Sequence, residues 1–187
     1  MHIPFSEILK SIPGVIGVRL EAELPYSVVS KVGQIELRNY PPFTLARVRN
    51  SGSFEAAGDA SFRALAEFIF GENEDGKKTA MTTPVFHDRN EDGWTMSFYI
   101  PAEESDLTPK NKEVWVEQMP QKTVAAYRYS GINGPTEMEA AEELLLAEVR
   151  LAGLKAVSKV WWAQYDQPFS LPMTKRNEAL VRIERLS

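Results

Sequence analysis

Apolar side chains recur at steps of three and four residues over 54–70, which is the spacing of one face of an α-helix. Ser53 precedes this run, and its hydroxyl can accept a hydrogen bond from an unpaired backbone amide of the first helical turn. Gly71 follows the run, and glycine often ends a helix because it adopts a left-handed backbone without strain. The pattern therefore predicts an amphipathic helix over 54–70.

A second helix is predicted over 136–152, followed by Gly153. Thr136 and Glu139 have the spacing of a capping box, in which the two side chains pair with each other's backbone amides. The residues expected to face the core are Met138, Ala141, Leu145, Val149 and Ala152.

Short apolar or alternating runs on both sides of each helix are typical of strands. They lie within 26–40, 43–49, 79–86, 94–100, 157–165 and 178–183. Glu91-Asp-Gly93 is typical of a hairpin turn, and the polar stretch 102–112 is the expected loop between halves. The fold class is therefore predicted to be α+β, with a mostly antiparallel sheet that curls toward a barrel.

The chain nearly repeats itself. Segments 44–52 and 123–131 share Thr, Ala, Arg, Ser and Gly at a constant offset of 79 residues, and the same offset pairs Leu37 with Val116. Each copy then continues into one of the two helical patterns. We therefore expect one βαβ-like unit to occur twice, and a groove between two such halves is a common place for a small ligand.

The two halves are predicted at about 32–101 and 111–184, within a single domain over 21–187 that follows an N-terminal extension over 1–20. The chain has 187 residues, 43% of them hydrophobic, which is enough for one well-packed core.

Composition excludes several classes of function. The formal net charge is −5 and no run of Lys or Arg exceeds two, which argues against nucleic acid as a partner. The chain has no cysteine, so disulfides, thiolate metal sites and thiol nucleophiles are excluded. No apolar stretch reaches the length of a membrane span and no signal-peptide pattern occurs, which predicts a soluble cytoplasmic protein.

Seven short motifs are spread over about residues 21–184. They are Glu21-x-x-x-Pro25-Tyr-x-Val, Ile35-Glu-Leu-Arg-Asn-Tyr-Pro-Pro42, Phe54-Glu-Ala with Phe62-x-x-Leu-x-x-Phe-Ile, Lys78-Thr-Ala-Met-Thr-Thr-Pro-Val85, Ser97-Phe-Tyr-Ile-Pro101, Tyr165-Asp-Gln-Pro-Phe169 and Arg176-Asn-Glu178. In order and spacing these motifs resemble the SOUL haem-binding family, and Met-Thr-x-Pro-Val is the most specific of them.

The resemblance implies a distorted antiparallel β-barrel of eight or nine strands, with pseudo-twofold symmetry and two flanking helices. It also implies binding of haem or another tetrapyrrole, for buffering or delivery, in an apolar groove along the first helix. The fold is similar to that of effector-binding domains of bacterial multidrug-responsive regulators, which bind planar or cationic small molecules between the same halves.

The resemblance places ligand-binding residues on the first helix and the following strand. Phe62, Ala66 and Phe70 lie off the main apolar stripe and are the expected groove floor, with Arg63 beside them. Met81 is expected in the groove wall, because a flexible thioether suits an irregular apolar ligand; ligation of iron by Met81 is the alternative. A further alternative is that Phe62 and Phe70 simply pack on the sheet.

Two basic residues, Lys175 and Arg176, precede Asn177-Glu178, where family members direct a basic residue at the ligand. Arginine can bind a propionate through two parallel hydrogen bonds. The first helix differs, because Asp59 and Glu67 stand where vertebrate members carry basic residues, and carboxylates there would repel propionates.

His87 is the obvious candidate for an axial haem ligand. It lies beside Asp88, Arg89 and Asn90 before the hairpin turn, which predicts a solvent-exposed structural histidine instead.

No hydrolase, metalloprotease or phosphate-binding motif occurs, and no catalytic residue is assigned. An enzymatic alternative is a small-molecule hydrolase that pairs Glu178 with Tyr99, Tyr127 or Tyr165. A carboxyl group in an apolar pocket has a raised pKa and can act as a base. A third hypothesis is a scaffold protein that uses its surface for protein contacts and has lost ligand binding.

Overall fold

The computed structural model describes residues 20–166, 173 and 175–185. By their contacts these residues form two compact units: the first contains 20–24 and 43–119, and the second contains the remainder. Apart from Leu20, the expected N-terminal extension lies outside the described residues. Within the described residues, no helix is long and apolar enough to cross a membrane.

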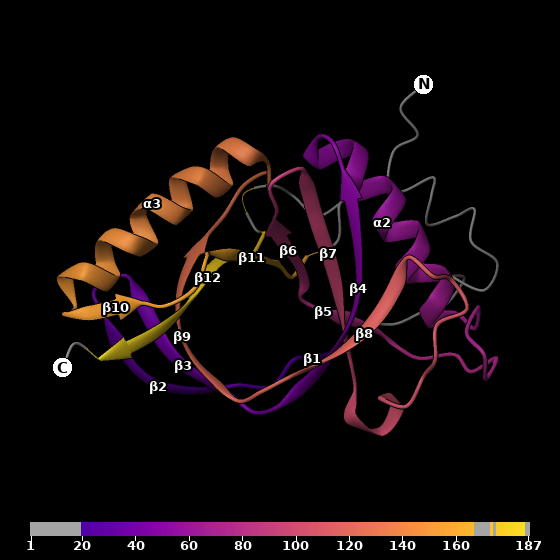
Figure 1. The fold of residues 1–187 in the computed structure, drawn as a ribbon. Helices are drawn as coiled ribbons and strands as arrows, with labels where there is room; N and C mark the ends of the chain where they lie inside the picture. Colours follow the sequence, from indigo (N-terminus) through magenta and orange to yellow (C-terminus); the bar gives the residue numbers. More distant parts are fainter. Residues whose placement is uncertain (1–19, 167–172, 174, 186–187) are drawn as a thin grey trace. The chain divides into compact units, whose positions relative to one another are not determined.

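The first unit is an antiparallel sheet with one helix packed against it (Figure 1). Its strands are ordered β6 (Val85–Arg89), β7 (Gly93–Ile100), β4 (Phe43–Ser51) and β8 (Val114–Met119), and helix α2 (Phe54–Ile69) packs on β4 and β7. The unit also contains the parallel pair β1 (Leu20–Glu23) and β5 (Met81–Thr83) and the short 3-10 helix η1 (Ala102–Glu104).

The second unit has a matching arrangement. Its strands are ordered β2 (Ser27–Val32), β3 (Ile35–Tyr40), β9 (Lys122–Tyr129), β12 (Asn177–Arg185) and β11 (Trp161–Gln164), and β10 (Leu154–Ala156) also pairs with β12. Helix α3 (Pro135–Leu151) packs against β9, β10 and β12 (Figure 1). These two α-helices are the ones predicted from the sequence.

Helix α2 forms as the apolar spacing predicted. The Ser53 hydroxyl accepts a hydrogen bond from the Ala56 amide at 3.3 Å, which confirms the predicted cap, and Gly71 follows the helix with a φ of 112°. Phe62 lies edge-on against Phe98 of the sheet, with ring centroids 5.5 Å apart. Burial of one such side chain contributes about 2 kcal/mol, so the contact between Phe62 and Phe98 stabilises the core of the first unit.

The predicted capping box of α3 is wrong. The helix begins at Pro135, its N-cap is Gly134, and no side chain caps it. Proline suits the first helical position because its fixed φ is already helical and its missing amide needs no partner there, so Thr136 falls inside the helix. Of the predicted core stripe, Met138, Ala141, Leu145 and Val149 are buried as expected.

The strand register follows the sequence repeat. In the second unit Leu37 of β3 lies opposite Ala125 of β9, and in the first unit Val116 of β8 lies opposite Ala46 of β4. An offset of 79 residues converts one pair into the other. The first unit therefore contains β8, which comes from the C-terminal half of the sequence. The second unit contains the equivalent strand β3, which comes from the N-terminal half.

The α+β class with antiparallel sheets and two helices is confirmed over the described residues. In each unit the first strand of the order does not pair with the last strand, so neither described sheet closes on itself. The predicted barrel is therefore not confirmed, and the pseudo-twofold rotation stays a prediction.

Candidate functional site

The two faces of the second unit's sheet carry different chemistry. Trp162 lies opposite Ala179 in the sheet, and its indole nitrogen donates a hydrogen bond to the Met138 carbonyl of α3 at 3.0 Å. Alternate residues of a strand point to opposite faces, so Glu178 points away from α3. Glu36, Arg38 and Tyr40 occupy every second position of β3, so their side chains point to the same face as Glu178. A charged cluster therefore forms on the face opposite the helix.

Glu178 is the centre of this cluster and is fully buried. Arg38, which is 3% exposed, binds it through two hydrogen bonds of 2.5 and 2.9 Å. Arg176 Nε and the Tyr165 hydroxyl each donate a further bond of 3.0 Å. Four donors occupy the four acceptor positions that a carboxylate offers, so Glu178 is saturated.

This environment holds Glu178 in its ionised form. Burial alone would raise the pKa of its carboxyl group, but the hydrogen bonds and charges of Arg38 and Arg176 bring that pKa below its ordinary value. Burial would likewise lower the pKa of Arg38, and the contact with Glu178 raises it instead. The hydrolase alternative needs a carboxyl group with a raised pKa, whereas the pKa of Glu178 is lowered by its two arginines.

Tyrosine rings flank the two guanidinium groups. Arg38 lies 4.2 Å from the ring centroid of Tyr26, and Arg176 lies 3.6 Å from that of Tyr165. Arg176 also donates a 2.8 Å hydrogen bond to the Tyr26 hydroxyl. Burial raises the pKa of Tyr40 to about 12 and raises the pKa of Tyr165 as well, so both phenols stay neutral at physiological pH.

A pocket of about 370 Å³ opens beside this network and lies wholly within the second unit. Its size is within the range of small-molecule sites. The charged residues lining it are Lys31, Glu36, Arg38, Arg128, Arg176 and Glu178, a surplus of two positive charges. Lys31 is bound to Glu36 at 2.7 Å. Arg128 is exposed and forms no ion pair with any residue that the structure describes, so the pocket favours an anionic ligand.

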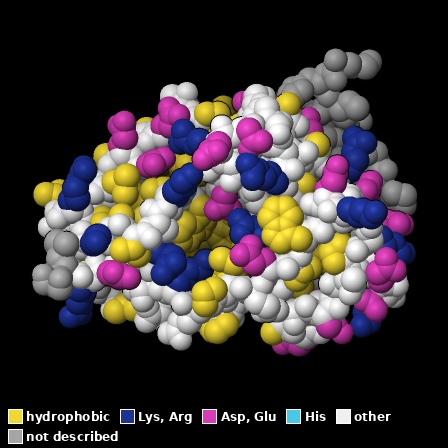
Figure 2. Space-filling model, viewed as in Figure 1, with side chains coloured by type: hydrophobic (Ala, Val, Ile, Leu, Met, Phe, Trp, Pro, Cys, Tyr) yellow, Lys and Arg dark blue, Asp and Glu magenta, His cyan; other side chains and the backbone are white. Residues whose placement is uncertain are grey.

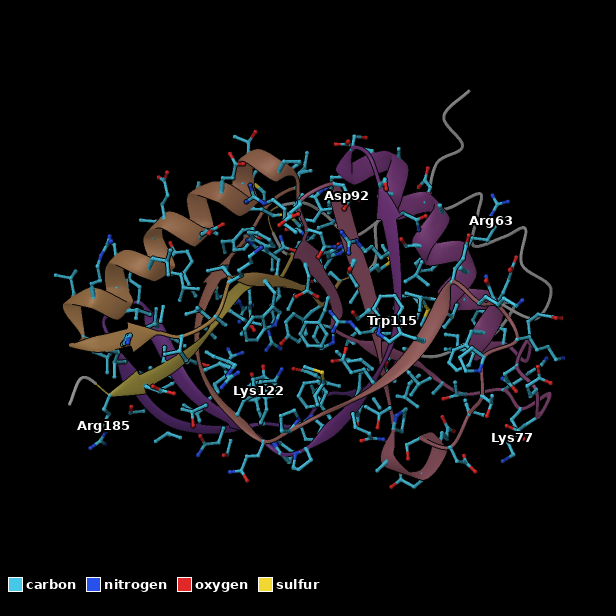
Figure 3. All side chains as sticks on the ribbon, in the orientation of Figure 1. Arg63, Lys77, Asp92, Trp115, Lys122 and Arg185 are labelled. Atoms are coloured by element: carbon cyan, nitrogen blue, oxygen red, sulfur yellow. The ribbon has the colours of Figure 1, made fainter. Side chains whose placement is uncertain are left out.

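The expected groove floor lies elsewhere. Phe62, Ala66 and Phe70 are buried in the core of the first unit, and Met81 packs against that core. Phe62 and Phe70 therefore pack in the core of the first unit, and the assignment of these residues to a ligand site stays a prediction. Arg63 is exposed and points away from α2 into solvent (Figure 3). A ligand groove beside α2 stays a prediction.

The two basic residues of the loop differ in position. Arg176 lines the pocket and contacts Glu178, whereas Lys175 is 8% exposed and is not among the residues lining the pocket. Of the three tyrosines considered with Glu178, the described hydrogen bonds connect Tyr165 to it.

His87 is buried, at 4% exposure, and the prediction that it faces solvent is wrong. It lies in β6 opposite Met96, and its ring centroid is 5.2 Å from that of Phe54, the first residue of α2. Polar neighbours misled the prediction because alternate strand residues face opposite ways. Among the described residues, no group of three or more His, Cys, Asp and Glu side chains is placed to hold a metal ion.

Sequence reasoning missed Tyr26, Glu36, Arg38, Tyr40 and Arg128. The available signal was the set of motifs itself. Four of the seven motifs supply the network, and they contain Pro25-Tyr26, Ile35-Glu-Leu-Arg-Asn-Tyr40, Tyr165-Asp and Arg176-Asn-Glu178.

The visible surface gives no sign of a nucleic-acid site. On the face seen in Figure 2, Lys and Arg side chains of the described residues are mixed with Asp and Glu and form no broad basic field.

Comparison with solved structures shows the fold. The chain is similar to EcmrR in its DNA complex (TM-score 0.65, 12% identity), covering 82% of this chain and 58% of that one, so it spans less than two thirds of that protein. It is also similar to the EcmrR C-terminal domain (TM-score 0.60, 12% identity, 82% and 98% coverage). A third similar structure is a hydrolase from Listeria innocua (TM-score 0.53, 11% identity, 83% and 94% coverage).

No curated protein matches the chain. The model of the SOUL heme-binding protein family matches residues 21–182, nearly the whole chain. This match agrees with the seven motifs, four of which meet in the buried network. The chain therefore belongs to the SOUL heme-binding protein family.

Proposed function

We propose that this protein binds haem or another planar tetrapyrrole, for buffering or delivery, and that the pocket of the second unit receives a carboxylate of the ligand. Family membership supports the ligand class. The observation that carries the proposal is the surplus of positive charge in the pocket, beside a glutamate that its own arginines already neutralise.

Arg128 is the expected first contact. It lies directly opposite Glu178 in the β9–β12 pairing, on the same face of the sheet, and its guanidinium group has no ion-pair partner among the described residues. A carboxylate and a guanidinium group form two parallel hydrogen bonds. The Tyr26 ring also lines the pocket, and the Arg38 guanidinium group lies 4.2 Å from its centroid.

The donor set fits the acid groups of a tetrapyrrole and not its metal. The described lining contains no histidine and no methionine, and the hydroxyl of Tyr26 in that lining already accepts a 2.8 Å hydrogen bond from Arg176. The bound ligand is therefore expected to be held by its carboxylates and by apolar contact. The pseudo-twofold barrel and the cytoplasmic location stay expectations from the sequence, and the groove beside α2 is the alternative place for the ligand.

The hydrolase alternative has one observation in its favour, the 3.0 Å hydrogen bond between Tyr165 and Glu178. A general base must accept a proton, however, and Glu178 accepts four hydrogen bonds and has a lowered pKa. The geometry therefore favours binding over hydrolysis.

The test is a haemin titration followed in the Soret region, with Arg128→Ala and the control Arg150→Ala. Arg150 is an exposed cation on α3 that does not line the pocket, so the control makes the same change of charge outside the lining. We expect Arg128→Ala to weaken binding about fivefold or more, the order of one partly exposed ion pair, and the control to bind like the wild type.

A haemin dimethyl ester, which lacks the acid groups, should bind the wild type more weakly than haemin does. The Arg128→Ala variant should discriminate less between the two forms. Equal affinity of the wild type for both forms would refute the carboxylate contact. A wild type without a saturable spectral change would refute tetrapyrrole binding.

A further inference from the structure

The hairpin of β2 and β3 forms one wall of the pocket. Six of the residues lining the pocket come from this hairpin, namely Lys31, Gly33, Gln34, Ile35, Glu36 and Arg38. Strand β2 is an end strand of the second unit's sheet, and all six of its residues are exposed. Within the second unit its described backbone pairing is with β3 alone, so the wall is anchored from one side.

One side chain of α3 holds the turn of this hairpin. The Gln34 amide donates a 3.0 Å hydrogen bond to Glu148 Oε2, and the Gln34 side chain donates a weaker one of 3.4 Å to Oε1. Glu148 precedes Val149, a buried residue of α3, so the backbone that carries the Glu148 side chain is fixed by the packing of the helix. The contact therefore links a fixed helix to the turn of the pocket wall.

Gly33, in the turn of the hairpin, leaves space for this contact. Its φ of +56° is one that glycine adopts readily. A Cβ at this position would lie 2.1 Å from Glu148 Oε2, which is closer than two non-bonded atoms can approach. The glycine therefore makes room for the carboxylate to reach the backbone of the turn.

We propose that Glu148 is a positioning residue for the ligand pocket: by binding the turn at Gln34 it fixes the β2–β3 wall and so sets how firmly the ligand is enclosed. This inference rests on the proposed function. Glu148 is not among the residues lining the pocket, so its effect on a ligand acts through the hairpin.

The test compares Glu148→Ala, Glu148→Gln and the control Glu143→Ala. Glu143 is an exposed glutamate on the same helix, so its removal makes the same change of charge without touching the turn. Haemin affinity and backbone hydrogen exchange over 31–36 are measured for each variant. Exchange reports the hold on the turn without any ligand.

We expect Glu148→Ala to weaken haemin binding about fivefold and to speed exchange at Gln34 about tenfold or more, the order of one lost hydrogen bond to a charged group. The Gln variant keeps an oxygen that can accept from the Gln34 amide, so it should recover most of both losses. A purely electrostatic role for Glu148 would show no such recovery, and Glu143→Ala should match the wild type.

Unchanged exchange at Gln34 in Glu148→Ala would overturn the inference, whatever happens to affinity. Faster exchange with unchanged haemin affinity would show that the wall is released without effect on the ligand, and would overturn the positioning role while leaving the proposed function standing. A wild type that binds no haemin overturns the proposed function and with it the positioning role, and exchange then decides only whether Glu148 holds the turn.

Discussion

Replacement of Glu178 by Gln tests whether the buried network depends on an ionised carboxylate. The change removes one negative charge from a fully buried position between Arg38 and Arg176 while keeping the shape of the side chain. Breaking a buried ion pair by removing one partner costs about 3–5 kcal/mol, because the other charge is left in a medium of low polarity.

The structure sets the expected value near the lower end of that range. Arg38 keeps hydrogen bonds of 3.0 and 2.8 Å to Glu36, and the amide oxygen of the new glutamine still accepts one donor. We therefore expect the free energy of unfolding to fall by about 3 kcal/mol. For a chain of this length that corresponds to a fall in Tm of roughly 6–12 °C.

Urea unfolding at pH 7 measures the change, with Glu36→Gln as the control. Glu36 binds the same arginine but is 26% exposed, so its loss should cost about 1 kcal/mol or less. A loss below about 1 kcal/mol for Glu178→Gln would refute the claim that the carboxylate charge stabilises the fold.

The dependence on pH gives a second check. The pKa of Glu178 is lowered by folding from an ordinary value of 4.5, so its contribution to stability is complete above that value and is lost as pH falls below it. The stability difference between the wild type and Glu178→Gln should therefore shrink in acid. A difference that stays constant between pH 7 and pH 3 would contradict an ionised Glu178.

Three further variants test the rest of the molecule. Ser53→Ala removes the cap of α2 and should lower the free energy of unfolding by about 1 kcal/mol in urea unfolding, whereas Thr136→Ala, at the wrongly predicted cap of α3, should change it by less than about 0.5 kcal/mol. Replacing Asp59 and Glu67 together with Lys should leave haemin affinity unchanged at low salt if the carboxylates are received in the second unit, and a gain that disappears as salt rises would instead locate them beside α2.

Local patterns predicted the helices well and the site poorly, for physical reasons. The 3.6-residue period of a buried helix face appears directly in the sequence, so α2 and α3 were found to within one residue at each end. The cap of α3 was missed because Pro135 begins the helix one residue early. The polar neighbours of His87 do not indicate its exposure, because a strand directs adjacent side chains to opposite faces.

The network could not be derived from spacing. Arg38 and Glu178 are 140 residues apart in the sequence and meet only because β3 and β12 both pair with β9 in one register. A shift of one residue in either pairing would turn one partner to the opposite face. The motifs that carry these residues were visible, but their meeting is a property of the sheet.

The charge balance of the pocket decides which ligands suit it. A lone buried carboxylate would favour a cation, because transfer of an unpaired charge from water is costly and a ligand of opposite sign offsets that cost. Here Arg38 and Arg176 already compensate Glu178, and Glu36 compensates Lys31. The charge that remains for a ligand is that of Arg128, together with the net positive charge of the two arginines around one carboxylate. The same saturated glutamate that makes a poor base therefore organises a site for an acid, and loss of Arg128 should reduce the preference for the acid form of the ligand while leaving the buried network in place.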